Sequence, residues 1–176
     1  MTDLPRPEGS EYADFYSRYV ALVPDGDILH TLQHQLGETL ALLQGVAEDR
    51  ETHRYAKGKW SLREVIGHLL DTERLFAFRA LAMARSDDVD LPGVDQDEWA
   101  DTSNAGDRPL DDLAAEWAAL RRANIHMFGS IGSVAGARTG VASGYSFTVR
   151  SFPWIIAGHE LWHRKAIASD YLGGEA

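Results

Sequence analysis

The chain of 176 residues is long enough for one domain with a continuous hydrophobic core, and its 44% hydrophobic and 25% charged residues are typical of globular proteins. We therefore expect a single domain over residues 1–176. A formal net charge of −10 argues against a nucleic-acid-binding protein, because contacts with phosphates require clustered Lys and Arg. The chain contains no Cys, which excludes disulfides, a thiolate metal site and a Cys nucleophile.

Four segments have the periodicity of amphipathic helices, and none has the sustained alternation of a β-strand, which predicts an all-α protein. The first expected helix begins after Pro24, with Asp25 or Asp27 as its N-cap, and ends near Asp49. No apolar stretch reaches the ~18 residues of a membrane span, and no signal peptide is recognisable, so we expect a cytoplasmic protein without membrane contact.

The second expected helix begins at the sequence SLRE, where Ser61 and Glu64 can form a capping box, and ends near Ala84. The acidic segment from Arg85 to Arg108 is too long for a simple turn, so we expect it to cover one end of the helices.

The third expected helix has Pro109 in its first turn and ends around Gly129. A Gly- and Ser-rich segment follows, which we expect to be a loop or short turns. The last helix is expected to begin between Thr148 and Pro153 and to end near Tyr171. Four helices of roughly 20 residues predict a four-helix bundle with long loops between helices two and three and between helices three and four.

The last helix contains the sequence HELWH, in which His159 and His163 lie one turn apart in the middle of the apolar face. A single His on an apolar face is usually a hydrogen-bonded core residue. This spacing, however, lets two imidazoles bind one ion, which favours a metal site. The apolar face consists of Phe152, Ile155, Ile156, Trp162, Ala166 and Ile167.

The same five letters form the metal-binding motif of zinc peptidases, but the rest of the sequence argues against a peptidase. After His163 the chain reads RKAIASDYLGGEA, which holds neither the third His of the extended motif nor a Glu on a following helix. Glu160, which would be the general base of a peptidase, lies about 100° from the centre of the apolar face, so we expect it at the edge of the bundle. A third ligand has to come from upstream.

The other histidines are compared as candidates for the third ligand by their positions relative to the apolar helix faces. His30 and His34 point away from the leucines of the first helix, His126 lies opposite the apolar face of the third helix, and His53 lies in a connection. These four are poor candidates. His68 lies on the flank of the second helix's apolar face, and this position does not decide whether it is the third ligand.

Glu73 competes with His68, because it lies near the centre of the second helix's apolar face. A carboxylate in that position must be paired, protonated or bound to something. One interpretation is an ion pair with an arginine such as Arg79 or Arg121. The other is a metal ligand, or a partner that orients a metal-bound histidine.

The segments GKWSLREVIGHLLDTERLFAFRALAMAR, LPGVDQDEW and YSFTVRSFPWIIAGHELWHRKAIASDYL resemble the DinB-like (DinB/YfiT) superfamily of candidate metalloenzymes, and the resemblance covers nearly the whole chain. It implies one DinB-like domain, a four-helix bundle, and a divalent metal held by His68, His159 and His163. Many relatives have a further His where this chain has Trp162, which we assign to packing.

The resemblance also indicates a function, since characterised members include thiol S-transferases and an isomerase that use small thiols such as mycothiol or bacillithiol. We expect Zn, Ni or another transition metal to activate a low-molecular-weight thiol for attack on a small electrophile. Glu73 and Glu160 are candidate catalytic groups. Trp99 is a candidate contact for the thiol cofactor, and Arg79 or Arg150 is expected to meet a carboxylate of that thiol. The alternatives are a metal-dependent hydrolase that activates water and a non-catalytic metal-binding stress protein. A homodimer is expected from the relatives.

Overall fold

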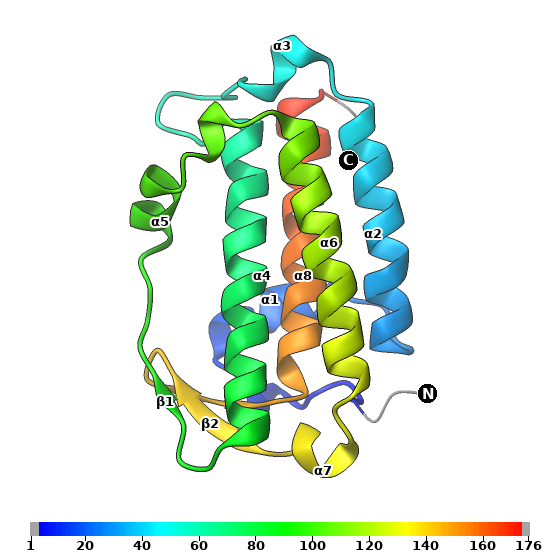
Figure 1. Ribbon diagram of the computed structural model, residues 1–176, viewed down its shortest axis with the longest axis vertical. Coiled ribbons are helices and arrows are strands. Elements are labelled where there is room, and N and C mark those ends of the chain that lie inside the picture. The colour runs from blue at the N-terminus through cyan, green and yellow to red at the C-terminus, as the bar shows by residue number, and fades with distance from the viewer. Residues whose placement is uncertain (1–3, 174–176) are drawn as a thin grey trace.

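The computed structural model describes residues 4–173 as a bundle of four long helices that lie side by side (Figure 1). Helices α6 and α8 each pack against both α2 and α4. The prediction of an all-α four-helix bundle is confirmed. The four helices are α2 (Ile28–Gln44), α4 (Leu62–Arg85), α6 (Leu110–Gly129) and α8 (Ser151–Ala166).

Local capping signals fix where the first two of these helices begin. The side chain of Asp27 accepts hydrogen bonds from the backbone N–H groups of Leu29 and His30, and Ser61 and Glu64 form the predicted capping box. Helix α2 ends at Gln44 rather than near Asp49, and a separate short helix α3 (Glu48–Glu51) follows. Glycine at position 45 has a low helix propensity, and Ala47 is already extended.

The other two bundle helices agree with the sequence more closely. Pro109 is the N-cap of α6, which ends at Gly129 as expected. Helix α8 begins at Ser151, inside the predicted interval, and continues as a π-helical turn (Ile167–Tyr171) to the predicted end.

The two long connections contain short elements that the sequence did not reveal. The first holds β1 (Asp90–Leu91), α5 (Gln96–Thr102) and a 3₁₀ turn (Ala105–Asp107), and the second holds α7 (Ser133–Gly136), β2 (Thr139–Ala142) and β3 (Tyr145–Thr148). Together the strands form a sheet in the order β1-β2-β3, with β1 parallel and β3 antiparallel to β2. The sheet lies at the lower end of the bundle in Figure 1.

The second connection was therefore wrongly expected to be only a loop or turns. Its strands have four residues each and are too short for a clear alternating pattern. The hairpin turn is formed by Ser143 and Gly144, which both have positive φ angles, 53° and 79°. Small residues with positive φ are typical of two-residue hairpin turns, so the pair Ser-Gly was the available signal.

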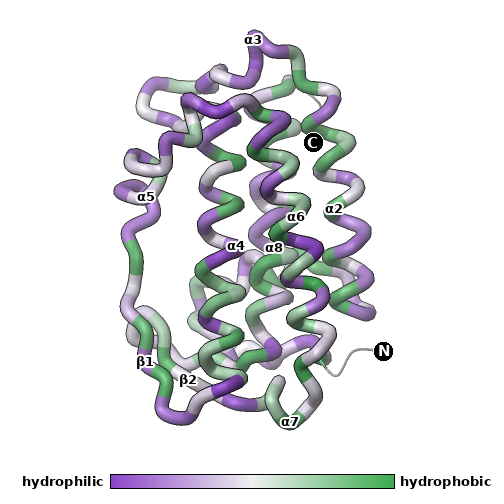
Figure 2. Tube along the Cα trace, viewed as in Figure 1, coloured by the Kyte–Doolittle hydropathy of each residue, from purple (hydrophilic) through white to green (hydrophobic). Residues whose placement is uncertain are grey.

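Two apolar clusters fill the bundle, and buried polar residues lie between them. One cluster contains the C-terminal half of α4, the start of α2 and the end of α6, and the other contains the N-terminal halves of α4 and α6 and the end of α2. Figure 2 shows hydrophilic positions interrupting the apolar stretches along α4, α6 and α8. The intervening buried polar residues include His68, Glu73, Arg121, His159 and Glu160. Within residues 4–173, no helix is long and apolar enough to cross a membrane.

Candidate metal centre

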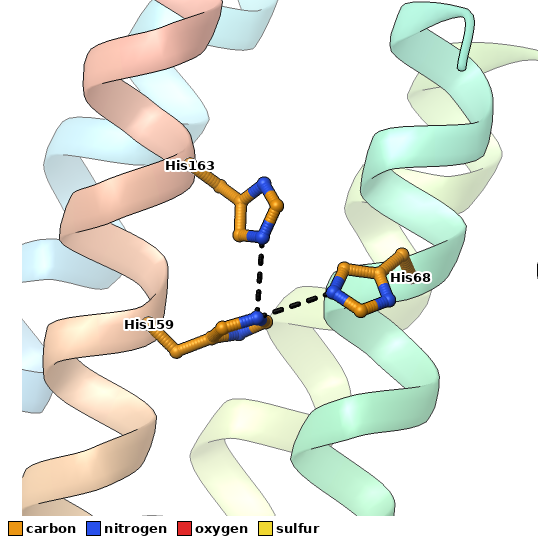
Figure 3. Close-up of side chains that lie close together, drawn as sticks. All are labelled: His68, His159 and His163. Carbon is orange, nitrogen blue, oxygen red and sulfur yellow. Dashed lines mark hydrogen bonds between the residues drawn. The ribbon is translucent and has the colours of Figure 1, made fainter. Parts of the chain in front are cut away.

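Helices α4 and α8 bring the three histidines of interest together (Figure 3). The Nε2 atoms of His68 and His163 each lie 3.1 Å from Nε2 of His159. His159 and His163 come from successive turns of α8, and His68 comes from the facing surface of α4. One nitrogen of each ring lies within 4.8 Å of the others. His68, which the helical periodicity left undecided as the third ligand, therefore lies beside the pair.

A glycine precedes two of these histidines in the sequence, and each glycine permits a close contact. A Cβ atom at Gly158 would lie 2.0 Å from the backbone oxygen of Tyr19, in the short helix α1 (Ser17–Val20). A Cβ atom at Gly67 would lie 2.4 Å from Cβ of Ala105. Both distances are far below van der Waals contact, so a larger residue would push the neighbouring segment away from the histidines.

All three histidines are neutral at pH 7. Burial lowers the pKa of His68 to about 3, with His163 as a second cause, and burial lowers the pKa of His163 to about 4. Burial, His163 and His68 hold the pKa of His159 well below its usual value. His68 and His159 are only 8% and 7% exposed. Neutral imidazoles have the free lone pair that a metal ligand needs.

The geometry of the donor set fits a divalent transition metal. In a tetrahedral site with Zn–N distances of about 2.0–2.1 Å, ligand nitrogens lie about 3.4 Å apart. This is close to the 3.1 Å that separates Nε2 of His159 from Nε2 of each of the other two histidines. Hydrogen bonding alone explains the cluster less well. Nε2 of His159 faces two other nitrogens, and an imidazole nitrogen with one lone pair accepts well from only one donor.

Neighbouring side chains fix the orientation of the histidine rings. The hydroxyl of Thr72, one turn along α4, lies 3.4 Å from Nδ1 of His68. The ring centroids of Trp60 and His68 lie 4.8 Å apart, and the ring of Tyr19 packs edge-on against that of His159 with 5.3 Å between the centroids. Thr72 could have been found in the sequence from its spacing of four residues after His68, whereas nothing local pointed to Tyr19.

Glu73 and Glu160 lie in a buried ionic cluster with Arg121 rather than among the histidines. Arg121 donates two hydrogen bonds of 2.8 Å to Glu73 and one of 2.6 Å to Glu160. Glu73 also accepts from Trp117 and Asn124, and Glu160 accepts from Thr39. The interpretation of Glu73 as the partner of an arginine is confirmed, with Arg121 as that arginine.

The expectation that Glu160 lies at the edge of the bundle is wrong, because its side chain is only 1% exposed. Helix α8 is buried on all sides from Ser151 to Glu160, since it packs against α1, α2 and α4. The helical periodicity of one segment shows its apolar face, but it cannot show that a polar residue such as Glu160 has a buried partner on another helix. The catalytic role expected of Glu73 and Glu160 stays a prediction, but their carboxylates face Arg121.

A cavity of about 170 Å³ adjoins the histidines on one side, and His68 and His159 line it together with Arg79. A larger cavity of about 400 Å³ adjoins His163. Trp162 lines this second cavity and is 44% exposed, although the sequence placed it on the apolar face of the last helix. Its ring still contacts Tyr19 at 5.7 Å.

Of the three predicted cofactor contacts, the structure places only Arg79 in a cavity with the histidines. Trp99 lies on α5, is 37% exposed and lines neither cavity. Arg150 pairs with Glu11, to which its Nε donates a hydrogen bond of 2.7 Å. The acidic connection contributes Gln96 to the smaller cavity and Asp97 to the larger one.

The sequence profile of the DinB superfamily matches residues 31–167, a range that includes all three histidines. The chain belongs to the DinB superfamily. Among solved structures, this chain is similar to YfiT from Bacillus subtilis, with a TM-score of 0.68 and 14% identity. The match covers 96% of this chain and 94% of YfiT. YfiT is described as a probable metal-dependent hydrolase with an unusual four-helix bundle topology. At this identity the similarity shows a shared fold. No curated protein matches the chain.

Proposed function

We propose that this DinB-superfamily protein binds a divalent transition-metal ion through His68, His159 and His163 and transfers a low-molecular-weight thiol to a small electrophile. The convergence of three neutral imidazoles carries the proposal, with Nε2 of His68 and of His163 each 3.1 Å from Nε2 of His159. A divalent ion held by three imidazoles keeps an open position, where it lowers the pKa of a bound thiol or water.

The residues around the histidines support a thiol as the nucleophile. The chain has no Cys, so no thiol of its own competes for the ion. The smaller cavity has no carboxylate among its lining residues, and the carboxylates of Glu73 and Glu160 are held by Arg121. A thiol, with a pKa of about 8.5, needs less help to ionise than water at about 15.7. Thr72 holds the ring of His68, and the aromatic rings of Trp60 and Tyr19 shield the histidines from solvent.

A hydrolase is the second candidate function. Two observations favour it, namely the description of YfiT as a probable metal-dependent hydrolase and the carboxylate of Asp97 in the cavity that His163 also lines. Asp97 is the group that we expect to act as general base in that case.

Metal content is the first test of the proposal. We expect purified wild-type protein to contain about one equivalent of a transition metal by elemental analysis, and His163→Ala to contain at least ten-fold less, because two imidazoles remain. His126→Ala is the matched control, since His126 is exposed on α6. Wild-type metal content in His163→Ala would contradict the proposed site.

Reaction with model compounds separates the two functions. We expect the loaded protein to accelerate the reaction of 2-mercaptoethanol with 1-chloro-2,4-dinitrobenzene, and His163→Ala to lose this acceleration. Turnover of 4-nitrophenyl acetate without any thiol, lost in Asp97→Asn, would instead establish the hydrolase. A metal-loaded protein with neither activity would favour the non-catalytic hypothesis. The cytoplasmic location and the homodimer stay predictions.

A further inference from the structure

Arg79 is a buried cation whose polar neighbours are all neutral. Its side chain is 2% exposed, and its Nη2 donates hydrogen bonds to the backbone oxygen of Pro92 at 3.0 Å and to the hydroxyl of Ser143 at 2.9 Å. The hydroxyl of Tyr16 is the remaining polar neighbour, and Nε of Arg79 has no hydrogen-bond partner. Over residues 4–173, no carboxylate forms an ion pair with Arg79.

Such an arrangement is unfavourable unless an anion completes it. A guanidinium stays charged in a protein, and burying a charge without a counter-charge costs several kcal/mol. Arg121 in the same bundle shows the usual solution, with two carboxylates around one guanidinium. The counter-charge of Arg79 is therefore expected to come from a bound molecule.

The smaller cavity connects this cation with the histidines. His68, Thr72 and Arg79 all line the cavity from α4. Thr72 and Arg79 lie about one and three turns after His68, so the Cα atoms of His68 and Arg79 are about 16 Å apart. His159 lines the same cavity from α8. A single elongated small molecule can therefore contact Arg79 at one end and the histidine cluster at the other.

The lining of the cavity selects the kind of anion. Away from the histidines and the ion that they are proposed to hold, Arg79 is the single charged side chain among the lining residues. One positive charge balances a monoanion such as a carboxylate and leaves a phosphate dianion with an unbalanced charge. Gln96, Ser143 and Tyr16 add neutral polar groups at the cavity wall. The rest of the wall is largely apolar and aromatic, with Phe15, Leu75, Phe76 and Val94.

We propose that Arg79 binds the carboxylate of a small organic acid whose other end reacts at the histidine cluster. This assigns a substrate class to the site and rests on the proposed function. The carboxylate replaces the missing partner of the guanidinium, and the length of the molecule between its carboxylate and its reacting group sets its fit in the cavity.

Mercaptoalkanoic acids of three to eight carbons, each compared with its neutral amide, test the proposal in Co²⁺-loaded protein. Thiol binding is followed by the visible absorption of the Co²⁺ ion, which does not depend on turnover. We expect at least one acid to bind about ten-fold more tightly than its amide in the wild-type protein. In Arg79→Gln the acid is expected to bind no better than the amide, with metal content unchanged.

Arg85→Gln is the matched control, because Arg85 lies exposed at the end of the same helix and its loss changes the net charge equally. The control is expected to keep the ten-fold preference. The proposal is overturned if no acid is preferred in the wild-type protein, or if the preference survives in Arg79→Gln. Absence of any preference in the wild-type protein overturns the proposal even if Arg79→Gln does not fold.

A separate measurement distinguishes failure of this inference from failure of the proposed function. The thiol chemistry fails if the wild-type protein takes up no Co²⁺, or if no thiol changes its spectrum. Arg79 is then tested in metal-free protein by NMR titration with hexanoate and hexanamide. Tighter binding of hexanoate in the wild type and equal binding in Arg79→Gln support the carboxylate site, and equal binding in both proteins refutes it.

Discussion

The two buried arginines of this bundle have nearly the same exposure and opposite surroundings. Arg121 is 1% exposed and contacts two carboxylates, whereas Arg79 is 2% exposed and contacts only neutral oxygens. Burial alone would lower the pKa of Arg121, but Glu160 and Glu73 raise it above its usual value. Burial lowers the pKa of Arg79, and only Tyr16 opposes this.

This difference indicates two uses for a buried charge. The cluster around Arg121 joins α6 to α4 through Glu73 and to α8 through Glu160, and Thr39 adds α2, so the interaction is complete within the protein. Arg79 joins α4 to the hairpin turn, to the backbone before α5 and to the hydroxyl of Tyr16, and it borders a cavity. A buried charge that the fold leaves incomplete beside a cavity indicates a ligand.

The largest effect is expected from removing the cation of the complete cluster. Arg121→Met leaves two buried carboxylates without a counter-charge, which should lower the free energy of unfolding by about 3–5 kcal/mol. Arg122→Met is the control, since Arg122 is the exposed neighbour in sequence, and should change it by no more than about 0.5 kcal/mol. Urea denaturation measures both. A loss below about 1 kcal/mol in Arg121→Met would show that the cluster does not stabilise the bundle.

An intermediate effect is expected from acidifying the histidine cluster in chelated protein. The folded pKa of His68 is about 3 and the unfolded value is about 6.5, so between these values the unfolded chain binds more protons. Stability therefore falls as the pH drops below about 6.5, by about 2 kcal/mol for this one histidine between pH 7 and pH 5. Denaturation of wild type and His68→Ala over this range should show a steeper decline for the wild type. Parallel curves would mean that His68 titrates normally in the folded protein.

The smallest effect is expected at the incomplete site. Arg79→Met removes two hydrogen bonds to neutral oxygens but also removes an unpaired buried charge, so the free energy of unfolding should change by less than about 1 kcal/mol in either direction. The same urea experiment compares it directly with Arg121→Met. A loss as large as that of Arg121→Met would show that Arg79 is a structural cation, and the comparison between the two arginines would fail.

The sequence by itself determined the four helices and most of their ends. Asp27 and the pair Ser61 and Glu64 act on backbone groups within three residues, so their effect can be read without the fold. The same holds for His159 and His163, whose spacing of one turn puts both rings on one face of α8. Helical periodicity placed His68 on the flank of its helix's apolar face and did not decide whether it is the third ligand, and the family resemblance selected it.

Tertiary structure alone decided which side chains meet across the bundle. Arg121 reaches Glu73 and Glu160 over 48 and 39 residues of sequence, and His68 reaches His159 over 91. Hydrophobic periodicity predicts that a helix face is buried, but it does not specify which helix packs against that face. For the same reason the sequence could not separate Arg121 from Arg79. Their different roles depend on carboxylates that only the packing of α4, α6 and α8 brings to one of them and not to the other.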